Sequence, residues 1–363
     1  MNCKREKIKV THVFVLSHNR HVLPYINFIR TLLSHPQLEH RIVIYTNEDK
    51  QIYQPAFGDD LSLTNQRDKV VTIVRSARSK HKVILHGLYD NVLLLKLITN
   101  HRALRHVIWS MWGADLYYEV PKGITGKIIE FARRQVLPII GCKIGLQGDF
   151  DYLEKQCKTN CGNFTEIGFP AWFYNQRSLP QSDIKPLRTN RLNALVGNSG
   201  DRTNNYFEVI SLLANSTLFH SLTFVLNYGA SLDEVEAIKN AAKEKLNHLS
   251  LTFLTEQCDY LDFIQLVSQH DAVIYNHDRQ QGVGTLNIAC EFGLYLFIPN
   301  KNPLTQTYRN WQIETVDTHS IDTLSTIDLP SIDARKRSQK NIRAICQPQI
   351  CADKLITEIL RDQ

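Results

Sequence analysis

Short apolar, β-branched runs alternate along this chain with longer segments whose apolar residues recur every three to four positions. Runs of the first kind are typical of buried strands, and the second spacing is typical of amphipathic helices. In the first half we predict strands at residues 10–16, 42–45, 70–74, 83–85, 106–109 and 143–146. We predict helices there at residues 21–33, 91–98, 124–137 and 150–157. This alternation indicates an α/β protein with a parallel, doubly wound sheet.

The second half repeats the alternation after a polar stretch, 175–191, that carries Pro180 and Pro186. Its predicted strands are 192–196, 222–226, 251–254, 272–275 and 294–298, and its helices include 232–246 and 260–267. We therefore expect two Rossmann-like domains that face a central cleft, residues 1–180 and 192–330, joined by a linker at 181–191. A helical segment, 331–363, is expected to pack back on the first domain.

The composition fits this picture and adds few constraints. Of the 363 residues, 43% are hydrophobic and 21% are charged, as in ordinary globular proteins. The net charge of +6 is spread along the chain, so we expect no nucleic-acid partner. We expect no signal peptide in the polar start of the chain and no transmembrane helix. The eight cysteines lack metal-ligand spacing, which favours reduced thiols in a cytoplasmic protein.

A polar loop at 278–285 follows the predicted strand 272–275 and opens a helical segment. Backbone N–H groups and the helix dipole at such a helix start favour an anion, and an arginine adds forked donors that suit phosphate. The loop has neither the P-loop nor the G-x-G-x-x-G pattern. We predict a diphosphate cradle, with a tight packing turn as the alternative. Its candidate residues are Arg279, Gln280, Gln281, Gly282, Gly284 and Thr285.

A second loop of the same kind follows the predicted strand 192–196. It also combines glycines, amide side chains and an arginine before a helix, and Asp201 or Thr203 can cap that helix. Two such loops in one α/β half suit a nucleotide-diphosphate site at the carboxyl ends of parallel strands. The candidate binding residues in this loop are Gly197, Asn198, Ser199, Gly200 and Arg202.

Three motifs together resemble glycosyltransferase family 56. They are WGADLY at 112–117, VGNSGDR at 196–202 and RQQGVGTL at 279–286. Shorter similarities occur in the same order at 18–20, 86–87, 148–149, 169–170 and 300–303, so the resemblance spans residues 10 to 315. Known members of the family transfer 4-acetamido-4,6-dideoxygalactose (Fuc4NAc) in the synthesis of enterobacterial common antigen. The segment after residue 170, the helix 232–246 and the last fifty residues depart from the family pattern, which leaves the sugar and the acceptor open.

The resemblance implies a GT-B fold and a dTDP-sugar donor. It also implies a polyprenyl-diphosphate-linked oligosaccharide acceptor at the cytoplasmic face of the inner membrane, where the protein would be peripheral. No cofactor and no metal are expected, because helix dipoles and basic side chains take over the neutralisation of phosphate in that fold. Three alternatives remain: an epimerase or hydrolase of the same fold, a fucosyltransferase with another nucleotide sugar, and a non-catalytic binding module.

Glycosyl transfer also needs a base for the acceptor hydroxyl, and we expect it in the first domain. Asp115 is the first candidate because it follows the predicted strand 106–109 in a glycine-bearing turn. Its alternatives are a helix cap or an ion pair with a nearby arginine. His18, at the end of the first predicted strand, is the second candidate, and His86 is a third.

The segment 122–143 interleaves basic with apolar residues. Its basic residues are Lys127, Arg133, Arg134 and Lys143, and its apolar residues are Ile124, Ile128, Ile129, Phe131, Val136 and Leu137. A basic amphipathic helix can lie on an anionic bilayer surface, which would suit a lipid-linked acceptor. An ordinary core helix with a solvated face is the alternative.

Overall fold

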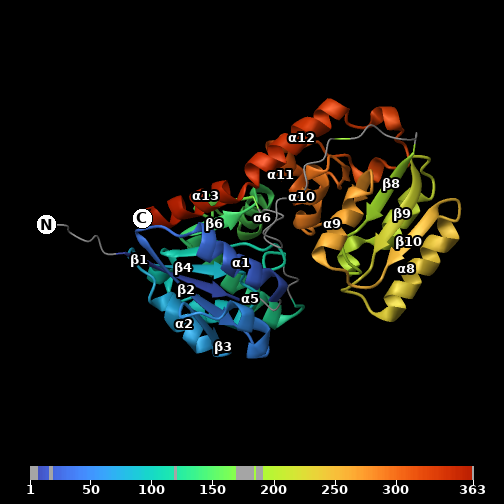
Figure 1. Ribbon diagram of the computed structural model, residues 1–363. Coiled ribbons are helices and arrows are strands. Elements are labelled where there is room, and N and C mark those ends of the chain that lie inside the picture. The colour runs from blue at the N-terminus through green and yellow to red at the C-terminus, as the bar shows by residue number, and fades with distance from the viewer. Residues whose placement is uncertain (1–6, 16–18, 118–120, 169–183, 185–190, 362–363) are drawn as a thin grey trace. The chain divides into compact units, whose positions relative to one another are not determined.

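The computed structural model describes residues 7–15, 19–117, 121–168, 184 and 191–361. The chain divides into two compact units (Figure 1). Unit 1 comprises Met1–Phe169 together with Gln347–Gln363, and unit 2 comprises Pro170–Cys346. The expected segment 331–363 is therefore divided, with its first helix in unit 2 and its second in unit 1.

Unit 1 contains a parallel sheet of seven strands in the order β3-β2-β1-β4-β5-β6-β7. The strands are β1 (Ile8–Phe14), β2 (Leu38–Tyr45), β3 (Leu61–Thr64), β4 (His81–His86), β5 (Val107–Ser110), β6 (Cys142–Gly145) and β7 (Asn163–Glu166). The helices are α1 (Asn19–Leu32), α2 (Arg67–Arg75), α3 (Asn91–Leu97), α4 (His101–Leu104), α5 (Ile124–Val136), α6 (Gln147–Cys157) and α13 (Pro348–Leu360). The inner strands are buried on both faces, as their continuous apolar runs require.

One strand prediction is wrong. Residues 70–74 belong to helix α2, and the sheet instead takes Leu61–Thr64 as β3. Val70, Val71 and Val74 lie on one helical face that is buried in the core of unit 1. Packing of that face outweighs the preference of β-branched residues for strands, which is weak compared with burial.

Unit 2 contains a parallel sheet of five strands in the order β10-β9-β8-β11-β12. The strands are β8 (Leu192–Val196), β9 (Phe219–Val225), β10 (Ser250–Leu254), β11 (Ala272–Ile274) and β12 (Tyr295–Phe297). The helices are α7 (Tyr206–Leu213), α8 (Leu232–Lys245), α9 (Tyr260–Ser268), α10 (Val283–Glu291), α11 (Pro303–Asn310) and α12 (Ile332–Ile345). These strands coincide, within a few residues at their ends, with those predicted for the second half.

Each sheet has one point at which the strand order reverses. In unit 1 the reversal lies between β1 and β4, and in unit 2 it lies between β8 and β11. Loops that leave the carboxyl ends of such neighbouring strands diverge to opposite faces and open a crevice where ligands bind in α/β proteins. The loops predicted to bind diphosphate follow β8 and β11, so the topology of unit 2 brings them together.

Candidate functional site

The side chain of Gln281 links the two glycine loops of unit 2. Its Nε2 donates to Asn198 Oδ1 at 3.2 Å, and its Oε1 accepts from the Thr203 hydroxyl at 2.6 Å. Both loops emerge at the carboxyl edge of adjacent strands, so Gln281 connects them across that edge. The structure thus brings together the loops that the sequence predicted.

Asn204 is the buried centre of this arrangement. Its Oδ1 accepts from the backbone N–H of Asn198 at 3.1 Å and lies 2.9 Å from Nε2 of His277. Its amide nitrogen donates to Ser199 Oγ and to the carbonyl of Asp201. Burial, followed by the charge of Arg279, lowers the pKa of His277 to about 3, so this ring is neutral at physiological pH. Sequence reasoning missed Asn204 and His277, whose role appears only when the two loops are placed side by side.

Two glycines lie where any side chain would clash with a neighbouring tyrosine. Gly197 has φ +70°, and a Cβ there would lie 2.2 Å from the Tyr206 hydroxyl. Gly282 has φ +65°, and its Cβ would lie 2.6 Å from the Tyr275 ring. Both positions combine a left-handed backbone with a close approach, which glycine alone tolerates. A third, Gly200, donates its N–H to the carbonyl of Tyr228 at 2.6 Å.

Helix α10 begins with its backbone donors uncapped by any side chain. Gly282 is the N-cap residue, and Gly284 and Thr285 lie in the first turn. The first N–H groups of a helix have no partner within it, so this end favours an anion. Gln280 precedes the helix and is buried.

The two arginines of these loops differ in their surroundings. Arg279 is half-buried and forms no ion pair with any residue that the structure describes. Burial raises the pKa of Asp201, but hydrogen bonds from Thr203 and the charge of Arg279 outweigh it, and the pKa is lowered overall. Arg202 is 88% exposed and lies 2.5 Å from Glu234. The charge of Arg279 is therefore unpaired among the described residues, whereas that of Arg202 is held in an exposed ion pair.

In unit 1, Asp115 is a buried carboxylate whose two oxygens both accept hydrogen bonds. Its Oδ2 accepts from the backbone N–H of Leu88 at 3.0 Å and from Trp109 Nε1 at 2.9 Å, and its Oδ1 accepts from the backbone N–H of Trp112. Arg133 contacts its backbone carbonyl rather than its carboxylate. Burial raises the pKa of Asp115 in spite of these hydrogen bonds. The geometry is that of a group that fixes the turn after β5.

Other polar groups at this edge of unit 1 differ from Asp115. His18 lies outside the described residues. Asp149 is 1% exposed, accepts from the Tyr117 hydroxyl at 2.7 Å, and has no partner for its Oδ2. Burial raises the pKa of Asp149 to about 7, and the nearby charge of Asp115 adds to the effect. His86 ends β4 at the point where the strand order reverses.

The predicted basic helix is α5, and its residues divide between two faces. Gly126, Ile129, Ala132 and Val136 face the core. Ile124, Ile128 and Phe131 are 79%, 49% and 58% exposed. Lys143 was expected on the basic surface, and this prediction is wrong because Lys143 is buried in β6. Its ammonium group donates to backbone carbonyls, including that of Ile140 at 2.6 Å.

The family model described as 4-alpha-L-fucosyltransferase glycosyl transferase group 56 matches residues 7–337. The chain belongs to this family. The resemblance seen in the loops is thereby confirmed, and the chain is a glycosyltransferase.

Solved structures place this family member within a known fold. HepE of Anabaena, solved with UDP, matches with a TM-score of 0.68 at 11% identity, over 97% of this chain and 99% of that one. The lipopolysaccharide outer core galactosyltransferase WaaB matches with a TM-score of 0.64 at 13% identity, over 96% and 98% of the two chains. Sucrose-phosphate synthase from Thermosynechococcus elongatus matches with a TM-score of 0.63 at 10% identity, over 96% and 97%. The predicted GT-B fold is confirmed.

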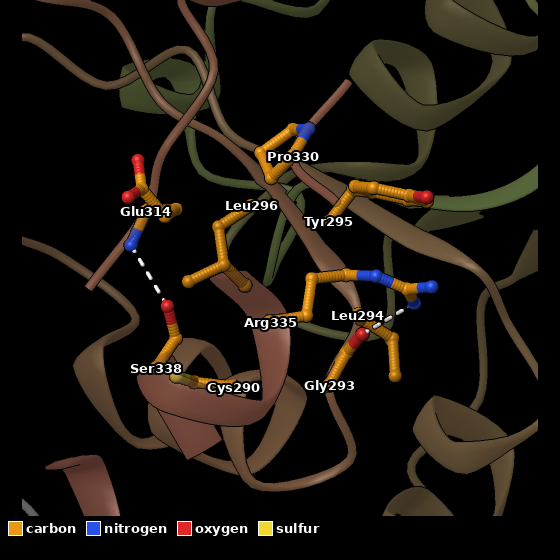
Figure 2. Close-up of a pocket in the computed structure, with 9 residues that line it drawn as sticks. All are labelled: Cys290, Gly293, Leu294, Tyr295, Leu296, Glu314, Pro330, Arg335 and Ser338. Atoms are coloured by element: carbon orange, nitrogen blue, oxygen red, sulfur yellow. Dashed lines mark hydrogen bonds between the residues drawn. The ribbon is translucent and has the colours of Figure 1, made fainter. Parts of the chain in front are cut away.

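Figure 2 shows a small hollow of unit 2 that lies away from the glycine loops. It lies where β12 begins, at the amino edge of the sheet, and Arg335 of α12 lines it. Nη1 of Arg335 donates to the carbonyl of Gly293 at 2.8 Å, and the guanidinium lies 4.4 Å from the centre of the Tyr295 ring. Because ligands of α/β sheets bind at the carboxyl edge, this hollow is separate from the candidate diphosphate site.

Two kinds of feature are absent from the part of the chain that the structure describes. No group of three or more His, Cys, Asp or Glu side chains there is arranged to hold a metal ion. None of the helices described is both long and apolar enough to cross a membrane.

Proposed function

We propose that this glycosyltransferase moves a 4-acetamido-4,6-dideoxygalactose-type sugar from a dTDP-sugar to a polyprenyl-diphosphate-linked oligosaccharide. The setting would be the synthesis of a bacterial surface polysaccharide like enterobacterial common antigen. The family description names a fucosyltransferase, which supports a 6-deoxy sugar of this shape. HepE was solved with UDP, which supports a nucleotide-linked donor in this fold.

The observation that carries this proposal is the meeting of the two glycine loops that follow β8 and β11. They provide the start of α10, the hydroxyl and amide groups around Gln281, and the charge of Arg279. A diphosphate that rests there would gain charge-assisted hydrogen bonds as the leaving group develops negative charge. Family membership favours this transfer reaction over the epimerase and the binding module.

Thermal-shift titrations with dTDP, UDP and GDP test the donor. We expect dTDP to stabilise the protein at the lowest concentration, since bound ligand shifts unfolding by mass action. A preference for GDP would favour a fucosyltransferase with another donor. No stabilisation by any nucleotide would refute the proposed site.

Arg279→Ala tests the placement of the diphosphate, with Arg202→Ala as the matched control. Loss of a charge-assisted hydrogen bond should weaken dTDP binding by about 1.5–3 kcal/mol in Arg279→Ala. Arg202 is exposed and paired with Glu234, so its removal should change the affinity little. Equal effects of the two substitutions would remove the special role of Arg279.

We also propose that the outer face of α5 docks the protein on an anionic bilayer. Ile124, Ile128 and Phe131 project from one side of this helix, and the exposed Lys127 and Arg134 lie among them. Apolar side chains that enter the interface, flanked by basic ones, are typical of peripheral membrane helices. This surface would place the enzyme, at the cytoplasmic face of the inner membrane, beside a lipid-linked acceptor.

Flotation with phosphatidylethanolamine vesicles, with and without phosphatidylglycerol, tests this surface. Phe131→Ser should weaken binding by about tenfold, because the free energy of burying a phenylalanine is at least ~1.5 kcal/mol. Phe57→Ser is the matched control, since Phe57 is 47% exposed in the same unit but lies outside α5. Equal binding of the two variants, or no binding of the unaltered protein, would refute the docking surface.

Transfer should not need a metal ion, because the start of α10 and Arg279 supply the positive potential that the diphosphate requires. The assay is sugar transfer in excess chelator after dialysis. Activity that is lost and then restored by magnesium or manganese would contradict this view.

A further inference from the structure

A chain of hydrogen-bonded histidines crosses the sheet of unit 1. His40 of β2, His12 of β1 and His86 of β4 lie on three neighbouring strands. His40 pairs in register with Val10 and His86 with Phe14, so each lies two residues from His12 along the sheet. Alternate residues of a strand share a face, and the three rings therefore form a diagonal path on one face of the sheet.

The carbonyl oxygen of Leu33, just after α1, fixes the direction of this chain. A carbonyl only accepts, so Nε2 of His40 carries the hydrogen that it donates to Leu33 at 3.0 Å. Nδ1 of neutral His40 then accepts from Nε2 of His12 at 2.9 Å. Nδ1 of His12 accepts in turn from Nε2 of His86 at 3.0 Å. The lone pair left over lies on Nδ1 of His86, which is buried and has no hydrogen-bond partner among the residues that the structure describes.

Burial keeps the three rings neutral, and it affects the pKa values at the two ends of the histidine chain differently. It lowers the pKa of His86 to about 3 and that of His12 well below its usual value. Burial also lowers the pKa of His40, but the Leu33 carbonyl opposes the effect. This carbonyl belongs to the C-terminal end of α1, where the helix dipole stabilises a cation. A positive charge is therefore least unfavourable on His40, which is also partly exposed to solvent.

The unpaired end of the histidine chain is buried at the carboxyl edge of the sheet, the edge where α/β domains bind ligands. His86 is the last residue of β4, beside the reversal of strand order between β1 and β4. Its ring stacks on Phe14 at 4.3 Å between centres and meets Tyr25 edge-on at 4.5 Å. These contacts hold the ring in one orientation. A buried nitrogen with an unused lone pair costs free energy, and a hydroxyl that reached it would remove that cost.

From this geometry we propose that His86 accepts the proton of the acceptor hydroxyl during glycosyl transfer and that His12 and His40 carry the charge away. The inference rests on the proposed transfer reaction. The acceptor O–H bond breaks, its oxygen bonds to the anomeric carbon, and the diphosphate leaves with the electron pair of the old bond. The proton joins Nδ1 of His86, whose Nε2 proton passes to His12, and the Nε2 proton of His12 passes to His40. His86 is then the catalytic base, and His12 and His40 are relay residues that position it.

The chain itself can be tested without any substrate by ¹⁵N NMR of the histidine rings in the whole protein. At pH 7 we expect His12, His40 and His86 each to carry hydrogen on Nε2 and a bare Nδ1. On acidification, His40 should be the first of the three to become protonated. A bare Nε2 on His86 at pH 7 would overturn the proposal.

Transfer kinetics test the role, with the dTDP-linked sugar and the polyprenyl-diphosphate oligosaccharide as substrates. His86→Phe should lower the transfer rate by about 10²–10⁴-fold, as loss of a general base does, and leave dTDP binding to unit 2 unchanged. His40→Phe keeps the base but removes the last residue of the relay. The solvent isotope effect on the transfer rate should therefore report one moving proton in this variant and several in the unaltered protein. His81→Phe is the control, because His81 lies on the same strand and bonds Thr11 outside the chain.

Four outcomes separate the parts of this proposal. An unchanged rate in folded His86→Phe would refute the base, and an unchanged rate and isotope effect in His40→Phe would refute the relay. If His86→Phe does not fold, the kinetics of His40→Phe, a substitution at a partly exposed residue, and the NMR tautomers of the unaltered protein test the proposal instead. If the unaltered protein binds dTDP but transfers no sugar, the proposed substrates are wrong, and the tautomers still test the histidine chain.

Discussion

At the scale of single residues, two buried carboxylates of unit 1 show how surroundings separate chemically identical groups. Asp115 accepts three hydrogen bonds from N–H groups, whereas Asp149 accepts one and leaves an oxygen unpaired. Both have a raised pKa because burial disfavours their charged form. The motif in the sequence indicated the importance of Asp115, but it could not distinguish a base from a group that holds a turn.

Asp115→Asn should lower stability at every pH. An asparagine offers one oxygen in place of two, so at least one of the N–H donors from Leu88, Trp109 or Trp112 would face an amide NH₂. The expected loss is about 1–3 kcal/mol in the free energy of unfolding, measured by denaturant titration. A variant of normal stability with a transfer rate lower by about 10²–10⁴-fold would instead make Asp115 the base.

Asp149→Asn should raise stability at alkaline pH. The pKa of Asp149 is about 7 in the folded protein against 3.8 as its reference, so the folded state keeps a proton that the unfolded chain releases. The contribution of Asp149 to the free energy of unfolding is therefore fully present below pH 4 and is lost as the pH rises toward 7. The variant should gain up to roughly 3 kcal/mol over the unaltered protein between pH 5 and pH 8. Asp151→Asn, on the exposed side of α6, is the matched control.

At the scale of elements, periodicity predicted most strands and helices, and it failed where local preference and burial disagree. The segment 70–74 is helical because Val70, Val71 and Val74 share a buried face, and the short strands β3 and β7 have too few apolar residues to be recognised. The meeting of the two glycine loops was predictable because glycine, amide and arginine residues follow a strand in each. Their organisers, Asn204 and His277, were not, because their contacts span more than seventy residues of sequence.

Gly197→Ala and Gly123→Ala separate backbone strain from steric clash. Both glycines have positive φ, but a Cβ at Gly123 meets nothing within 4 Å, whereas one at Gly197 lies 2.2 Å from the Tyr206 hydroxyl. Gly123 has ψ −160°, which with its positive φ defines a region nearly confined to glycine, so Gly123→Ala should cost about 1–3 kcal/mol of backbone strain alone. Gly197→Ala should cost more and should also weaken dTDP binding, because the loop must shift. Equal losses of unfolding free energy would mean that the clash is relieved without penalty.

At the scale of the whole molecule, unit 1 is discontinuous in sequence. Helix α13, drawn in red in Figure 1, returns after the whole of unit 2 and contacts α1 and β7. The buried Glu358 of α13 accepts from the Thr165 hydroxyl at 2.8 Å, and the Cys351 thiol lies 3.0 Å from the Gly168 carbonyl. Unit 1 is therefore completed by residues that follow unit 2 along the chain.

Leu355→Ala should weaken unit 1 and leave the nucleotide site intact. Leu355 of α13 is 1% exposed, and truncation of a buried leucine costs about 2–5 kcal/mol. Calorimetry should show a lower unfolding temperature for the transition that dTDP does not shift. Leu213→Ala in α7 is the matched control, and it should lower the transition that dTDP raises. A single transition that both variants lower equally would show that the two units unfold together.

The interrupted course of unit 1 also sets the order in which the protein can mature on the ribosome. When residue 169 has been made, all the strands of the unit 1 sheet have been synthesised but α13 has not. The ribosome must first make unit 2 before that helix emerges. At ordinary elongation rates of 5–20 residues per second, this delay lasts about 10–40 seconds. During that time the surface that α13 will cover is open to chaperones, and unit 2 can become native before the domain that precedes it.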